Sequence, residues 1–308
     1  MPLNAELAAF LDAIPLPRYE GEPAAYREKM DAGMAMRPVM TELPRVEDRT
    51  IPGPADAPEL AVRVYAPSSA PGLPVTVFYH GGGFCIGSIA SHDPVARKIA
   101  AAAECIVVSV EYRLAPEHAY PAAHEDAYAA YAWAREHAAE IGGDPDRVAV
   151  AGDSAGGSLA AAVCLMARDR GVAQPTFQLL WYPGTGLDAG AHASKPNDPL
   201  LPAVALAWFT EHYFAKLTDD QRREYATVGL APDLSGLAPA HVVVAGEDPL
   251  HAEGVAYAER LREAGVPTGL DDHEDLSHGF VSFADFVPPC AEAATSSYAA
   301  LRDALAKG

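Results

Sequence analysis

The 308-residue chain is long enough to bury a sizeable core, and 50% of its residues are hydrophobic, which fits one large domain or one domain with a smaller appendage. Its 42 acidic against 22 basic residues give a formal net charge of −20, and such a surface repels phosphate backbones and anionic lipids. The charge therefore argues against nucleic-acid binding and stable membrane association, and it favours neutral or cationic ligands.

Two helices are predicted before any strand. The first, "NAELAAFLDAI", begins at a capping Asn4 and carries apolar residues at helical spacing, and the second covers "EPAAYREKMDAGMAM". We expect this segment to form an arm or lid. The N-terminus lacks the basic region of a signal peptide and no apolar run reaches membrane-spanning length, so we expect a cytoplasmic protein.

From about residue 60 the chain alternates between strand-like and helical patterns. Strands are expected in "ELAVRVYAP", "PVTVFYHGGG", "CIVVSVEYR", "RVAVAG", "TFQLLWYP", "HVVVAGED" and "TGLDDH". Short β-branched runs that alternate with helices predict an α/β fold with a mostly parallel sheet and helices on both faces. Residues 184–238 contain helical stretches but no predicted strand. A segment of this length is too long for a loop, so it indicates an inserted subdomain.

The four cysteines show no spacing that suggests a metal site or a redox pair. They are Cys85, Cys105, Cys164 and Cys290. This scatter is typical of buried free thiols in a reducing compartment. We therefore expect no metal and no cofactor.

The stretch "VAVAGDSAGG" joins a predicted strand to a predicted helix and fits the G-x-S-x-G pattern of a nucleophile on a sharp turn. Such a turn requires residues with almost no side chain two before and two after the nucleophile, which accounts for Gly152 and Gly156. It lifts the Ser154 hydroxyl clear of the sheet. It also places the Ala155 N–H at a helix N-terminus, where a developing oxyanion is favoured.

A second motif, "YHGGGF", lies at the carboxyl end of a predicted strand, where open α/β sheets bind ligands. Its three glycines, Gly81, Gly82 and Gly83, allow backbone N–H groups to approach a substrate oxygen. A flexible turn needs only one glycine, and a phosphate-binding loop would carry the Lys and Ser/Thr that are missing here. Paired with the serine turn, the motif predicts an oxyanion hole.

A serine nucleophile needs a base, and the base needs an acid that orients it. Asp248 follows the strand "HVVVAGED", and His278 lies in the loop after the last short strand, at the same sheet edge. The chain order serine, acid, histidine is the order of this class of hydrolase. Glu247 is an alternative to Asp248, although we expect its longer side chain to point to solvent.

With these motifs in order, the chain resembles the bacterial hormone-sensitive-lipase-like (family IV) esterases of the α/β-hydrolase superfamily. The resemblance runs over nearly the whole chain and includes "HGGGF" (80–84), "YRLAPEHAYPAA" (112–123), "DPDRVAVAGDSAGG" (144–157), "YP" (182–183), "DPL" (248–250) and "HGF" (278–280). It implies hydrolysis of a small-molecule carboxylic ester without cofactor or metal. It implies Ser154 as nucleophile, His278 as general base and Asp248 as the orienting acid.

The resemblance also implies an oxyanion hole made by backbone N–H groups of the HGGG loop, chiefly Gly82 and Gly83, together with Ala155. Residues 112–123 carry no obvious chemistry, and we expect them to brace that loop through hydrogen bonds. A helical cap is implied as well, made from the N-terminal arm and the insertion.

We accordingly divide the chain into four segments. These are 1–50 as the N-terminal part of the cap, 51–183 as the first part of the hydrolase core, 184–238 as the cap insertion and 239–308 as the second part of the core. The substrate pocket is expected to include Phe84, Trp208, Phe209, Leu250 and Phe280. Aromatic closure, together with the resemblance, favours short- to medium-chain acyl or aryl esters.

Two departures from the family pattern concern the histidine. Ala252 stands where the family usually has an acid, so we expect one supporting hydrogen bond near Asp248 to be missing. The stretch before His278 is unusually acidic, with Asp271, Asp272, Glu274 and Asp275. Nearby carboxylates favour imidazolium, so the sequence predicts a raised pKa for His278.

Three questions stay open at the level of sequence. Relatives often dimerise through the last strand, but carboxylates blunt strand pairing, so a homodimer is possible without being predicted. Amide or carbamate cleavage at the same residues is an alternative to ester hydrolysis, since selectivity depends on small pocket contacts. A non-catalytic binding protein, like the plant gibberellin receptors that lack the histidine base, is disfavoured because all three catalytic residue types are present.

Overall fold

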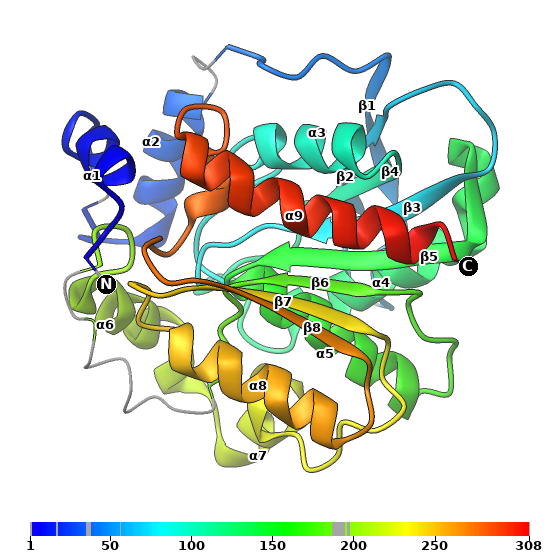
Figure 1. Ribbon diagram of the computed structural model, residues 1–308. Helices are drawn as coiled ribbons and strands as arrows, with labels where there is room; N and C mark the ends of the chain where they lie inside the picture. Colours follow the sequence, from blue (N-terminus) through cyan, green and yellow to red (C-terminus); the bar gives the residue numbers. More distant parts are fainter. Residues whose placement is uncertain are drawn as a thin grey trace.

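The fold is organised around one β-sheet (Figure 1), in a computed structural model that describes residues 2–307 apart from 17, 35–37, 56, 187–194, 196 and 197. Within these residues eight strands are present: β1 (Arg45–Ile51), β2 (Leu60–Ala66), β3 (Leu73–Tyr79), β4 (Ile106–Val110), β5 (Gly143–Asp153), β6 (Gln178–Trp181), β7 (Ala240–Ala245) and β8 (Thr268–His273). They lie in the order β1-β2-β4-β3-β5-β6-β7-β8. The β1–β2 and β2–β4 pairs are antiparallel and the remaining neighbours are parallel. The predicted mostly parallel sheet is confirmed.

Helices cover both faces of this sheet, as predicted (Figure 1). The longer helices are α1 (Ala5–Asp12), α2 (Pro23–Met34), α3 (Asp93–Ala102), α4 (Ala122–His137), α5 (Ala155–Asp169), α6 (Ala203–His212), α8 (His251–Glu263) and α9 (Pro288–Leu305). Helices α3 and α9 pack on one face, and α4, α5 and α8 pack on the other. The four cysteines are buried and unpaired, as expected.

The inner strands are apolar along almost their whole length because successive residues enter two different cores. In β3, Val77 packs with the α4–α5–α8 side and Phe78 with the α3–α9 side. In β4, Val108 packs on the α4–α5–α8 side and Val107 on the α3–α9 side. Burial on both faces is what a parallel sheet covered by helices requires, and it explains the continuous β-branched runs of the sequence.

Strand β1 was not predicted, and it pairs with β2 from Arg45 to Ile51. The strand lies at the edge of the sheet, and its polar residues pair with each other or with the neighbouring strand. Arg49 contacts Glu47 at 2.6 Å, and Arg63 of β2 contacts Asp48 at 2.6 Å. An edge strand with one solvated face can be this polar, so its residues lack the apolar run by which inner strands are found.

The segment 112–123 braces the HGGG loop, as predicted. The Tyr112 ring stacks on His80 with 4.2 Å between centroids, and its hydroxyl donates to the His80 carbonyl at 2.7 Å. Arg113 is fixed by Asp126 of α4, whose fully buried carboxylate accepts from the Arg113 backbone N–H and from its guanidinium. Burial lowers the pKa of His80 to about 3, so this histidine is neutral and serves the loop rather than proton transfer.

The N-terminal arm is seated on the cap insertion by aromatic side chains. Tyr19 stacks on Tyr26 and meets Phe209 of α6 edge-on, and Trp208 packs between them. The Trp208 indole N–H donates to the Gly21 carbonyl at 2.8 Å. Two segments far apart in the sequence therefore form one structural cover over the carboxyl ends of the strands.

The described residues of the insertion 184–238 are helical or irregular and contain no strand, in agreement with the prediction. Besides α6 they include α7 (Asp219–Gln221), a π-helical turn η4 (Arg222–Ala226) and a 3₁₀ turn η5 (Val228–Leu230). Across the part of the chain that the structure describes, no helix is both long and apolar enough to cross a membrane.

The Arg113–Asp126 pair predicts a strong stability effect. Asp126→Ala leaves a charged guanidinium partly buried without its partner, so the apparent free energy of unfolding in urea should fall by about 3–5 kcal/mol. The matched control is Asp303→Ala, which removes the exposed Arg302–Asp303 contact and should cost less than about 1 kcal/mol. If the free energy of unfolding fell by similar amounts in the two variants, the Arg113–Asp126 pair would not have the stabilising role given to it here.

Candidate active site

Ser154 occupies a strained turn between β5 and α5. Its φ of 55° lies in a region that a residue with a Cβ rarely adopts, and its N–H donates to the Trp181 carbonyl at 2.9 Å. A Cβ on Gly152 would lie 2.2 Å from the Gly156 carbonyl oxygen, and one on Gly156 would lie 1.9 Å from the Tyr79 oxygen. The two glycines are therefore required by close backbone approach, as the motif predicted.

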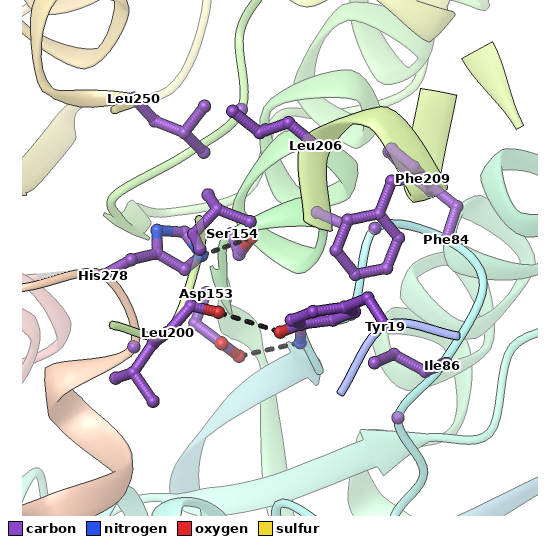
Figure 2. Close-up of a pocket in the computed structure, with 18 of the residues that line it drawn as sticks. Tyr19, Phe84, Ile86, Asp153, Ser154, Leu200, Leu206, Phe209, Leu250 and His278 are labelled. Carbon is purple, nitrogen blue, oxygen red and sulfur yellow. Dashed lines mark hydrogen bonds between the residues drawn. The ribbon is translucent and has the colours of Figure 1, made fainter. Parts of the chain in front are cut away.

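The structure brings Ser154, His278 and Asp248 into one hydrogen-bonded series. Ser154 Oγ lies 2.9 Å from His278 Nε2 (Figure 2), and on the other side of the ring His278 Nδ1 lies 2.6 Å from Asp248 Oδ2. The second carboxylate oxygen, Oδ1, accepts the Leu250 N–H at 2.8 Å. With the proton on Nδ1, His278 donates to Asp248 and its Nε2 accepts from the serine hydroxyl, which is the arrangement of a serine hydrolase triad.

The competing acid, Glu247, is placed elsewhere. Its carboxylate lies 2.8 Å from Lys195 Nζ and does not reach the imidazole. Asp248 is fully buried and Glu247 is partly exposed, as the sequence argument expected. Ala252 is exposed near the start of α8, and both oxygens of Asp248 are engaged without any contribution from that position.

A carboxylate next to Ser154 in the chain anchors the HGGG loop. Asp153, the last residue of β5, accepts the Gly81 N–H at 2.9 Å and contacts His92 Nε2 at 3.5 Å. Burial by itself would raise the pKa of Asp153, but the neighbouring imidazoles, chiefly that of His92, hold it below its usual value. Asp153 is therefore a carboxylate, and it ties the loop after β3 to the end of β5.

This contact removes Gly81 from the predicted oxyanion donors, because its N–H already has an acceptor. Within the described residues, no acceptor takes the N–H of Gly82 or Gly83. Ala155 is the first residue of α5, where backbone N–H groups have no intrahelical partner. Three N–H groups beside Ser154 are thus open to a ligand.

The pKa of His278 is raised, as predicted, but for a different reason. Burial by itself would lower it, and the carboxylates of Asp248, Asp198 and Asp153 outweigh that effect. The acidic stretch on β8 is occupied elsewhere: Asp271 pairs with His241, Asp272 with His251, and Asp275 accepts from the Asn4 side chain. These carboxylates are close to His278 in sequence, but their partners are His241, His251 and Asn4.

The triad opens into a cavity of about 1220 Å³. Phe84, Phe209 and Leu250 line it, as predicted, while Trp208 and Phe280 do not. Trp208 is instead part of the arm contact, and Phe280 packs on Tyr182 beneath the histidine loop.

Several wall residues were missed. They are Tyr19, Ile86, Leu200 and Leu206, which are drawn with Ser154 and His278 in Figure 2. They come from four separate segments, and no local pattern marks them. In the figure, Leu206 and Leu250 lie on one side of Ser154, and Tyr19, Ile86 and Leu200 lie on the other.

Comparison with known proteins gives a consistent result. Residues 76–282 match a family model described as an alpha/beta hydrolase fold. The chain is 42% identical to esterase LipI of Mycobacterium tuberculosis over 97% of this chain and 94% of the relative, and 46% identical to carboxylesterase NlhH of the same species over 85% and 83%. A solved hyperthermophilic esterase of the archaeon Pyrobaculum calidifontis superposes with a TM-score of 0.91 at 37% identity, covering 98% of this chain and 99% of the other.

The source of the raised histidine pKa is testable by NMR titration of labelled imidazole. The His278 resonance should titrate above the ordinary value of about 6.5, and Asp248→Asn should lower its midpoint because the main stabilising carboxylate is lost. Neutral imidazole, the form that can accept a proton, is then the major form only above this raised pKa. Asp271→Asn should leave the midpoint in place. A shift caused by Asp271→Asn, or a midpoint below 6.5 in the unmodified protein, would contradict the assignment.

Proposed function

The chain belongs to the hormone-sensitive-lipase-like family of the α/β-hydrolase superfamily, and on that premise we propose that it is a serine carboxylesterase acting on short- to medium-chain acyl or aryl esters. The observation that carries the proposal is the series from Ser154 Oγ through His278 to Asp248, at 2.9 and 2.6 Å, on the wall of a largely apolar cavity. Nothing in the reaction requires a cofactor.

In the first half of the proposed reaction, Ser154 Oγ attacks the ester carbonyl carbon while its proton passes to His278 Nε2. Asp248 holds the ring by accepting the Nδ1 proton and stabilises the imidazolium that forms. The imidazolium then gives its proton to the alcohol oxygen, the C–O bond breaks, and an acyl group remains on Ser154.

The negative charge on the carbonyl oxygen needs donors that are fixed in advance. The N–H groups of Gly82, Gly83 and Ala155 are the three candidates, because they lie beside Ser154 without another acceptor among the described residues. Gly81 has a supporting role, since its bond to Asp153 fixes the loop that carries the first two donors.

In the second half, a water molecule loses a proton to His278 Nε2 and attacks the acyl carbonyl carbon. The same three N–H groups hold the second oxyanion, and the serine leaves after receiving the proton back from the imidazolium. The carboxylic acid is released and the starting state is restored.

The shape and lining of the cavity support small alkyl and aryl esters as substrates. It extends to both sides of Ser154, so the acyl and alcohol portions of an ester would lie in opposite directions from the scissile bond. Its aliphatic and aromatic walls fit unbranched alkyl chains and single rings through apolar contact.

Hydrolysis of p-nitrophenyl esters of increasing acyl length tests the proposal. Activity should peak at short or medium acyl chains, and Ser154→Ala should lower kcat by roughly 10⁴-fold or more because the nucleophile is lost. The control Ser235→Ala, at an exposed serine hydrogen-bonded to Asp233, should match the unmodified protein.

Two outcomes would redirect the assignment. Equal activity in Ser154→Ala would mean that the turn is only a scaffold. Cleavage of anilides but not esters by the unmodified protein would establish an amidase in place of an esterase.

A further inference from the structure

A third buried carboxylate lies beside the triad, and it comes from the cap insertion. Asp198 is 4% exposed, and its Oδ1 accepts the N–H groups of Leu200 and Leu201 at 2.8 and 2.7 Å. Its Oδ2 accepts the backbone N–H of His278 at 3.1 Å. One carboxylate thus holds the turn that leads into α6 and the loop that carries the catalytic base.

The connection continues outward to the N-terminal arm. The Tyr19 hydroxyl donates to the Leu200 carbonyl at 2.8 Å (Figure 2), and the Tyr19 ring packs against Tyr26 and Phe209. Hydrogen bonds therefore run without a break from the arm through Leu200 and Asp198 to His278. The aromatic contacts alone would hold the arm on the insertion. The hydrogen bonds therefore add a separate link, from the arm to the loop that carries His278.

We propose that Asp198 is a positioning residue that couples the seated cap to the catalytic base: it fixes the backbone at His278 only while the arm and the insertion hold Leu200 in place. This inference rests on the proposed esterase function. The cap is then part of the catalytic apparatus as well as the wall of the cavity.

The histidine loop needs such an anchor because of where it lies. His278 follows β8, the edge strand of the sheet, and precedes Gly279 in the left-handed region at a φ of 72°. A loop at a sheet edge has no neighbouring strand on its outer side. Backbone bonds hold it at Leu276, whose carbonyl accepts the Glu247 N–H at 2.9 Å, and the N–H of His278 itself is held by Asp198. A displacement of about 1 Å in a catalytic group can reduce a rate by about 100-fold.

The charge of Asp198 adds a measurable signature. The ionisable groups that face the His278 ring are Asp248 from the loop after β7, Asp153 from the end of β5, Asp198 from the insertion, and the Tyr182 phenol. The three carboxylates together raise the pKa of the imidazole, and an uncharged anchor at position 198 would not contribute to that shift. Burial and the nearby Asp248 also raise the pKa of Asp198 itself, so its effect on His278 is present where Asp198 is ionised. Neutralising Asp198 should lower the pKa of His278.

The test is a pH profile of kcat and KM for Asp198→Asn with a short-chain p-nitrophenyl ester. We expect kcat to fall by about 10- to 100-fold with little change in KM, and the acidic limb of kcat/KM to move to lower pH. The matched control is Asp144→Asn. Asp144 likewise accepts a backbone N–H two residues ahead, at 3.0 Å, but it lies at the opposite end of β5 from Ser154. Asp144→Asn should have the kcat and the acidic limb of the unmodified protein.

Tyr19→Phe is the second variant, and it decides the question if Asp198→Asn does not fold. It removes the hydroxyl that holds Leu200 while leaving every carboxylate in place, so kcat should fall and the acidic limb should stay where it is. An acidic limb of Asp198→Asn that coincides with that of the unmodified enzyme, or a kcat of Tyr19→Phe equal to it, would overturn the coupling. Failure of the unmodified protein to hydrolyse esters would instead remove the proposed function, so the two failures are distinguishable.

Discussion

The close approach of backbone around Ser154 is the constraint on which the site depends. The carbonyl of Tyr79 at the end of β3 and the first turn of α5 are so near that only glycine fits at position 156. This packing forces Ser154 into its strained conformation and aligns the carboxyl ends of β3 and β5. Because the HGGG loop begins where β3 ends, nucleophile and open N–H groups are positioned by the same contact.

Charge at the site is arranged so that three carboxylates surround one histidine. Asp248, Asp153 and Asp198 reach His278 from three different segments, and each is also fixed by at least one backbone N–H group. Carboxylates held in this way need little rearrangement when imidazolium forms, so the environment favours the charged state of the base before the reaction begins. The same carboxylates serve as structural ties between loops.

The parts of the site that sequence could predict are those encoded locally. The turn at Ser154, the glycines after β3 and the residues that follow β7 and β8 each have a pattern within a few positions. Asp198 has none, because its role arises only when the insertion folds back on the histidine loop. Trp208 and Phe280 were misplaced for a related reason: an aromatic residue near the site can face either the cavity or the layer behind it, and packing alone decides. Strand β1 was not predicted because an edge strand needs no apolar run.

Both edges of the sheet carry charge. Strand β1 presents paired Arg and Glu or Asp side chains, and β8 presents Asp271 and Asp272. If two molecules added strand to strand at β8, the aspartates of one copy would face those of the other, and like charges across a strand pair are destabilising. Charged side chains on the outermost strands therefore disfavour extension of the sheet from one molecule to the next, a feature that opposes ordered aggregation in concentrated solution.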